Sequence, residues 1–434
     1  MVTAADAGHE LSIADLHPSL SDPALERMTF LNEVSSRFPD AVSFAAGRPH
    51  EEHFDVDALP RYLRVFQEHL AGRGADTAQI GRTLLQYGRT KGIIHELLAR
   101  YLALDEGIDV DPESIVVTVG CQEAIFLTLR ALCAGPDDVV LAVSPSYVGL
   151  TGAARLLDRE VVPVGENRGG VDLDHFIDQV RAVRARGKRP RAFYLVPDFA
   201  NPSGTSLDLE TRKTLLHLAE QHDVLLLEDN PYGLFQAADG VRVPTLKALD
   251  TSRRVVYLGS LAKTCFPGAR IGFAVADQRV STGSEPVLLA DELSKIKSML
   301  TVNTSPLAQA MAGGKLLEHG CSLLRANERE IAVYRHNMRF LLTGLAQRFT
   351  DVPTVGWNSP GGGFFAVVTV PFTADDEALE LSARRHGVLW TPMAHFYDGT
   401  GGANQLRLSI SALSPQQIDT GLDRLRSMVV NCAR

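Results

Sequence analysis

The stretch IVVTVGCQEAIFLTLRALCAGPDDVVLAV, residues 115–143, contains the pattern that decides the fold. It begins and ends with short apolar runs, 115–119 and 139–143, and between them lies a longer segment whose apolar residues have helical spacing. Strands that are apolar throughout are typical of parallel sheets, because helices cover both faces of such a sheet. The stretch therefore predicts a strand–helix–strand unit of an α/β protein.

The same pattern continues along the chain. Five more short apolar runs follow, at 161–164, 193–196, 224–228, 255–258 and 271–275. Most are separated by segments with helical spacing, so we expect one mainly parallel sheet. Farther on, a smaller α+β unit is expected, with a long helix at 327–349, strands within 361–370 and 405–411, and helices near 375–385 and 415–430.

Composition excludes several classes of protein. The net charge of −9 disfavours a nucleic-acid partner, because phosphate backbones require a basic surface. No run approaches the roughly 20 apolar residues of a membrane span, and the acidic N-terminus does not resemble a signal peptide. The five cysteines are widely spaced and lack a C-x-x-C pair, so we expect neither disulfides nor a metal site, and a reducing cytoplasmic location fits. No G-x-G-x-x-G follows the first strand, which argues against a dinucleotide-binding domain.

Polar residues follow the predicted strands, where ligands of open α/β sheets bind. The first strand is followed by a helix start with Gly120, Cys121 and Gln122, and later strands are followed by Tyr147, Asn201, Asp229, Tyr232, Ser260, Lys263 and Arg270. Taken one at a time, each has an ordinary structural explanation as a turn residue, a packing ring or a strand end.

Taken together, these residues offer the chemistry that one small molecule requires. A lysine amine forms a Schiff base with an aldehyde, and a carboxylate holds a pyridine nitrogen protonated. An amide and a phenol can bond a ring oxygen, and an aromatic ring can stack on the pyridine. A helix N-terminus, a serine and an arginine bind a phosphate. Pyridoxal 5′-phosphate needs all of these groups.

The motifs also carry a family resemblance. In chain order they are LLQYGRTKGI, VTVGCQEA, SPSYVG, PDFANPSG, EDNPYG, GSLAKTCFPGARIG and LRLSIS. Over about residues 28–430 the sequence resembles the fold-type I pyridoxal-phosphate enzymes of the class I/II aminotransferase family. Residues 28–130 are most similar to the (S)-3,5-dihydroxyphenylglycine transaminase-like subgroup of specialised metabolism.

The resemblance implies a role for each matching residue. Lys263 would bond the cofactor aldehyde, Asp229 the pyridine nitrogen, and Asn201 and Tyr232 the ring oxygen, while Tyr147 would stack on the ring. Gly120, Cys121, Gln122, Ser260 and Arg270 would surround the phosphate. The substrate would be bound by Arg407, Asn201 and the loop at Gly47 and Arg48. Tyr87 would reach the cofactor of a second subunit, which implies a homodimer with shared sites.

It also implies the architecture. The large cofactor-binding domain, residues 76–334, would carry a seven-stranded, mostly parallel sheet. Residues 28–75 and 335–434 would form a smaller α+β domain, and residues 1–27 an N-terminal arm that is flexible or loosely docked.

Several substrate-side residues have two interpretations. Arg48 is either a solvated loop residue or an extra cation for an acidic or phosphorylated substrate. Asp198, Met393, His395 and Tyr397 either shape the substrate pocket or serve only a turn and the packing. Lys297, Thr301 and Asn303 match a segment that would line the partner's pocket.

The expected activity is transamination between an α-amino acid and a 2-oxo acid, with Lys263, Asp229 and Tyr232 as catalytic residues. The alternative is γ-replacement or carbon–carbon bond formation (annulation) on an amino acid of the S-adenosylmethionine type, because the same residues serve its first step. A binding-only sensor domain of a transcription regulator is disfavoured, because the segment before residue 28 is too short for a DNA-binding domain.

Overall fold

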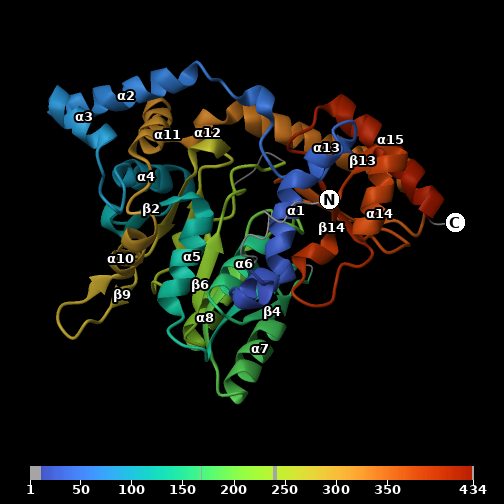
Figure 1. The fold of residues 1–434 in the computed structure, drawn as a ribbon, viewed down its shortest axis with the longest axis horizontal. Coiled ribbons are helices and arrows are strands. Elements are labelled where there is room, and N and C mark those ends of the chain that lie inside the picture. The colour runs from blue at the N-terminus through green and yellow to red at the C-terminus, as the bar shows by residue number, and fades with distance from the viewer. Residues whose placement is uncertain (1–10, 168, 238–241, 433–434) are drawn as a thin grey trace, which may run out of the picture.

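A seven-stranded sheet forms the centre of the computed structural model, which describes residues 11–167, 169–237 and 242–432 (Figure 1). Its strands, in spatial order, are β2 (Ile115–Val119), β8 (Ile271–Val275), β7 (Val255–Ser260), β6 (Leu225–Asp229), β5 (Arg189–Leu195), β3 (Asp138–Ser144) and β4 (Val161–Gly165). All run parallel except β8, which is antiparallel to both neighbours. Only residues 261–270 join β7 to β8, too few for the helical crossover that a parallel connection requires. The predicted mostly parallel, seven-stranded sheet is confirmed.

Helices fill the connections between the parallel strands. They are α5 (Gly120–Leu132), α6 (Val148–Leu156), α7 (Leu173–Ala185) and α8 (Leu209–Gln221). Helix α7 packs on β4 and β5 and helix α8 on β6, and Val180 and Leu215 of these helices share a buried cluster with Phe193 of β5. None of the helices in the described ranges is long and apolar enough to cross a membrane.

The predicted smaller α+β unit is also confirmed. Its sheet has the order β11 (Gly356–Trp357), β12 (Phe365–Thr369), β15 (Gln405–Ser409) and β14 (Thr391–Pro392), with antiparallel pairing throughout. The helices α13 (Glu328–Phe349), α14 (Asp376–Leu381) and α15 (Pro415–Cys432) complete the unit. The short strand β1 (Val42–Ser43) pairs in parallel with β13 (Val388–Leu389), so the N-terminal segment is bound to the C-terminal one.

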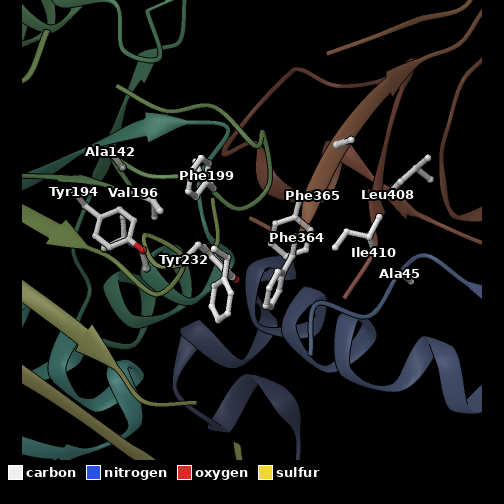
Figure 2. Close-up of a cluster of buried hydrophobic side chains, with 14 of the residues drawn as sticks. Ala45, Ala142, Tyr194, Val196, Phe199, Tyr232, Phe364, Phe365, Leu408 and Ile410 are labelled. Carbon is white, nitrogen blue, oxygen red and sulfur yellow. The ribbon is translucent and has the colours of Figure 1, made fainter. Parts of the chain in front are cut away.

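The core is continuous between the two sheets. Figure 2 shows Tyr194 of β5 together with Val196 and Tyr232, which follow β5 and β6, in one buried cluster with Phe364 and Phe365 at the start of β12. The ring of Tyr232 lies edge-on to both phenylalanines, with centroids 5.3 and 5.5 Å apart. Such aromatic pairs fix the relative position of the two sheets, and Val196 and Tyr232 bring the segments after the carboxyl ends of β5 and β6 to this junction.

The N-terminal segment docks on the large sheet's helices. Asp22 is the N-cap of helix α1 (Pro23–Arg37). Its carboxylate accepts a hydrogen bond from the Ala24 N–H at 2.9 Å and pairs with Arg155 of α6 at 3.0 Å. The predicted boundary between residues 27 and 28 therefore falls inside a helix, and the first ten residues of the expected arm lie outside the described ranges. The division into domains remains a prediction.

Candidate active site

A cavity of about 510 Å³ opens at the carboxyl ends of the central strands. It is lined by Ser35, Ala45, Ala46, Gly47, Arg48, Cys121, Gln122, Tyr147, Val148, Val196, Asn201, Asp229, Pro231, Tyr232, Ser260, Ala262, Lys263, Arg270 and Arg407. The predicted site residues are thus brought together, with the exceptions of Gly120, which lies just behind the wall, and Tyr87. This volume is in the usual range for small-molecule sites.

Lys263 lies just beyond the end of β7, with its amine inside the cavity. Its Nζ donates a hydrogen bond to the Gly47 carbonyl at 2.6 Å. Burial lowers the pKa of Lys263 to about 8, and the nearby positive charges of Arg407 and Arg270 act in the same direction. A neutral amine is therefore available near physiological pH, as a lysine nucleophile requires. The loop can approach so closely because residue 47 is glycine: a Cβ there would lie 2.7 Å from the Phe365 ring.

Asp229 ends β6 and is 4% exposed. The Tyr194 hydroxyl donates to its Oδ2 at 2.6 Å, and the Cys121 thiol to its Oδ1 at 3.5 Å. Burial raises the pKa of Asp229 to about 6, although both donors oppose the shift. No lysine or arginine in the described ranges forms an ion pair with this carboxylate. A buried carboxylate that lines the cavity and has no ion-pair partner within the described residues matches a protonated pyridine nitrogen.

Another part of the cavity wall has the features of an anion site. Gly120 opens α5 with φ +72°, and a Cβ there would collide with the Arg270 guanidinium. The Arg270 side chain is exposed, and within the described residues it makes a single, long hydrogen bond of 3.5 Å to the Pro267 carbonyl. The thiol of Cys121 turns to Asp229, and the Gln122 amide donates to the Gly149 carbonyl at 2.7 Å. Donors to a phosphate here would therefore be the free N–H groups of α5, Ser260 and Arg270.

Arg407 of β15 forms the substrate-side wall. It is 3% exposed and donates to the Asn201 side chain at 2.6 Å, the Ala45 carbonyl at 2.8 Å and the Thr391 hydroxyl at 3.2 Å. Its Nε is buried and has no partner in the described residues. The rings of Phe365 and Phe396 lie 4.4 and 4.8 Å from the guanidinium carbon. Burial lowers the pKa of Arg407 to about 10, so it remains charged and suits a carboxylate.

The hydroxyl groups of the two tyrosines predicted to contact the cofactor ring are protonated and uncharged. Burial raises the pKa of both Tyr147 and Tyr232. Tyr232 and Asn201 both line the cavity, and the side-chain oxygen of Asn201 accepts from Arg407. The amide nitrogen of Asn201 is left to serve a ligand in the same cavity.

The residues predicted for a partner's site lie away from this cavity. Tyr87 is 81% exposed. Lys297, in contrast, is fully buried and bonds Glu123 at 2.8 Å and Thr301 at 2.7 Å. The prediction that Lys297 lines a partner's pocket is therefore wrong, because its ammonium is committed to Glu123 inside the chain. Asn303 lies beside Gly88, next to Tyr87 in the sequence.

Most of the ambiguous substrate-side residues have structural roles. Asp198 pairs with the fully buried Arg212 at 2.5 Å. Met393 is 2% exposed and belongs to a small apolar cluster with Phe396, while His395 bonds Asp376 at 2.7 Å. None of these residues, nor Tyr397, lines the cavity. Arg48 does line it, with an exposed side chain.

Three functional neighbours were not predicted. Tyr194 binds Asp229, Thr391 binds Arg407, and Ser35 of α1 lines the cavity. A tyrosine inside the apolar run 193–196 was a usable signal for Tyr194, because a buried phenol needs a partner. Nothing in the sequence distinguished Thr391 or Ser35.

Known proteins show the same fold and family. The model of the family Aminotransferase class I and II matches residues 40–425. A curated (S)-3,5-dihydroxyphenylglycine transaminase from Amycolatopsis orientalis is 54% identical over 97% of this chain and 95% of its own length. The multiple substrate aminotransferase of Thermococcus profundus superposes with TM-score 0.81 at 27% identity, covering 96% of this chain and 98% of its own.

A third relative bears on the cofactor. The α-aminoadipate aminotransferase of Thermus thermophilus, solved with N-(5′-phosphopyridoxyl)-L-leucine, superposes with TM-score 0.77 at 27% identity over 97% of this chain and 99% of its own. The lysine, the buried carboxylate and the anion site described above fit that cofactor. The chain belongs to the class I and II aminotransferases, and its cofactor is pyridoxal 5′-phosphate.

Proposed function

We propose that this aminotransferase acts in specialised metabolism and transfers the amino group between (S)-3,5-dihydroxyphenylglycine and a 2-oxo acid. The observation that carries the proposal is the 54% identity, over nearly the full length of both chains, to a transaminase with that substrate. The cavity lining suits a substrate with a hydroxylated side chain, because it includes the polar side chains of Ser35 and Arg48 as well as Ala45 and Ala46.

The residues of this chain would divide the work as follows. Pyridoxal 5′-phosphate, when bound, accepts the electron pair released when a bond at the substrate Cα breaks. Asp229 would hold the pyridine nitrogen protonated, with Tyr194 and Cys121 orienting its two oxygens. Arg270, Ser260 and the start of α5 would bind the phosphate, and Tyr147 would cover the ring.

Arg407 would bind the substrate carboxylate and so place the Cα–H bond beside the Lys263 amine. Lys263 would bond the cofactor aldehyde in the resting enzyme and, once released, take the proton from Cα and return it during the reaction. Its lowered pKa leaves much of the amine neutral near pH 8, which suits a general base. Tyr232 and Asn201 would donate to the ring oxygen of the cofactor.

We further propose a homodimer with shared active sites. Two segments expose large apolar side chains: Leu85 and Tyr87 on one, and Met299, Leu300, Val302 and Leu307 on the other. The segments adjoin, since a Cβ on Gly88 would lie 3.6 Å from the Asn303 amide. Exposed apolar groups on adjoining segments are typical of a subunit interface.

The dimer is tested by complementation. Mixing inactive Lys263→Ala subunits with inactive Tyr87→Ala subunits should restore part of the activity, because one of the two sites in a hybrid contains both native residues. Failure to recover activity after proven subunit exchange, or a monomeric mass by light scattering, would contradict shared sites.

The reaction is tested by incubating the holoenzyme with (S)-3,5-dihydroxyphenylglycine and a panel of 2-oxo acids. We expect one 2-oxo acid product for each amino acid formed, and slower turnover of phenylglycine, which lacks the two hydroxyl groups. A parallel incubation contains S-adenosylmethionine in place of the amino donor. Absence of amino transfer with the whole panel, together with release of methylthioadenosine in this second incubation, would instead support γ-replacement.

A further inference from the structure

Glu166 is a partly buried carboxylate with no place in the chemistry described above. It follows β4, at the carboxyl edge of the large sheet. Its Oε1 accepts hydrogen bonds from the Ser203 hydroxyl at 2.8 Å and the Thr205 hydroxyl at 3.0 Å. Burial raises the pKa of Glu166 to about 7, and the two hydroxyl bonds oppose the shift. Tyr397, whose own pKa is raised by burial and by this carboxyl, is a titratable neighbour.

The two hydroxyls belong to the tight turn that carries Asn201. Within the turn, the Gly204 N–H donates to the Ala200 carbonyl at 2.7 Å and the Ala200 N–H to the Thr205 carbonyl at 2.9 Å. The Ser203 and Thr205 hydroxyls are also 2.8 Å from each other. Glu166 therefore holds the turn through two side chains at once.

The other side of the turn rests on the small sheet. The Asn358 amide donates to the Ser203 carbonyl at 2.6 Å, while its oxygen accepts from the Val367 N–H of β12 at 2.8 Å. Gly204, with φ +72°, fits against the same strand, since a Cβ there would lie 2.5 Å from the Phe365 carbonyl. The turn is thus fixed between the edge of the large sheet and the small sheet.

We infer that Glu166 is a positioning residue for substrate binding, which acts by holding the turn that presents Asn201 to Arg407. Asn201 bonds the guanidinium at 2.6 Å, so a displaced turn misplaces the carboxylate-binding group. The inference rests on the proposed role of Arg407. Arg407 binds substrate rather than moving protons, and Tyr232 would keep its own bond to the ring oxygen that Asn201 shares, so the loss should affect KM more than kcat.

The test combines kinetics with hydrogen exchange. In Glu166→Ala, KM for the amino donor should rise roughly tenfold with kcat within about twofold of wild type, as expected for lost bonds to a charged group. Amide exchange at residues 199–207 should accelerate about tenfold in the holoenzyme, measured by mass spectrometry. Thr205→Val should shift both quantities in the same direction by a smaller factor. The double variant should fall short of the product of the two single effects, because both changes disrupt one contact.

Glu160 provides a matched control at the other end of β4. It pairs with Arg186 at 2.9 Å on the surface, so Glu160→Gln should leave KM and the exchange of residues 199–207 unchanged. If Glu166→Ala does not fold, Glu166→Gln and Thr205→Val decide the question. Unchanged KM and unchanged exchange in these variants would overturn the inference, as would multiplicative effects in the double variant. A wild-type enzyme without amino transfer would instead refute the proposed function, and the exchange experiment would still test whether Glu166 holds the turn.

Discussion

The charge-preserving substitution Arg407→Lys tests the substrate clamp. A guanidinium has five N–H donors, and the hydrogen bonds to Asn201, Ala45 and Thr391 use three of them. Two donors therefore remain for a substrate carboxylate. A lysine ammonium has three donors in all, so the same three protein acceptors would occupy every one of them.

Two lost charge-assisted bonds at about 1.5 kcal/mol each amount to about 3 kcal/mol, or a roughly 100-fold rise in KM for the amino acid. The turnover number should change much less, because these bonds hold substrate and transition state alike. Initial rates with varied amino donor at saturating 2-oxo acid measure both quantities.

Arg426→Lys is the matched control. Arg426 pairs with Asp351 on the surface at 2.7 Å, far along α15 from the cavity, and its replacement should leave KM unchanged. A folded Arg407→Lys enzyme whose KM stays within about threefold of wild type would refute the reasoning and place the substrate carboxylate elsewhere.

Three other predictions concern the cofactor side of the cavity. Tyr194→Phe removes the hydroxyl that donates to Asp229 at 2.6 Å, and should raise the pKa of that carboxyl further above about 6. The loss of activity should therefore be larger at pH 6 than at pH 8. Equal losses at the two pH values would contradict the role of Tyr194. Only the neutral amine of Lys263 bonds the cofactor, and its pKa is lowered to about 8. The rate of cofactor attachment to apoenzyme, measured by stopped-flow absorbance, should therefore rise with pH up to about 8 and then level off. A rate that does not change between pH 6 and 8 would contradict this. Lys263→Ala should keep the circular dichroism of the wild type while losing amino transfer by at least about a thousandfold, and a variant with near-normal turnover would exclude Lys263 as the base.

Much of the fold could be predicted because its strands are apolar on both faces. The run 115–119 coincides with β2 and the run 271–275 with β8. The direction of β8 could not be predicted from its composition, because strand direction depends on the length of the connection, here residues 261–270. The helix expected at 327–349 is present as α13, because its periodicity is long and regular.

The cavity residues could be predicted where they directly follow a strand, as Asp229 and Lys263 do. Contacts between residues that are distant in the sequence could not be predicted. Tyr194 reaches Asp229 from a neighbouring strand, and Ala45 meets Arg407 across 362 positions of sequence. The role of Lys297 was predicted wrongly, because the position of a lysine in a helix does not reveal that Glu123, distant in the sequence, accepts a hydrogen bond from its ammonium group.

The account depends above all on Lys263 as the residue that carries pyridoxal 5′-phosphate. Reduction of the holoenzyme with borohydride fixes the cofactor to the amine that holds it, and peptide mass mapping identifies the lysine. We predict that the label is on the peptide that contains Lys263, at close to one per chain, and that it is absent from Lys263→Ala. A label on any other lysine, or none on a holoenzyme that transfers amino groups, would contradict the site described here.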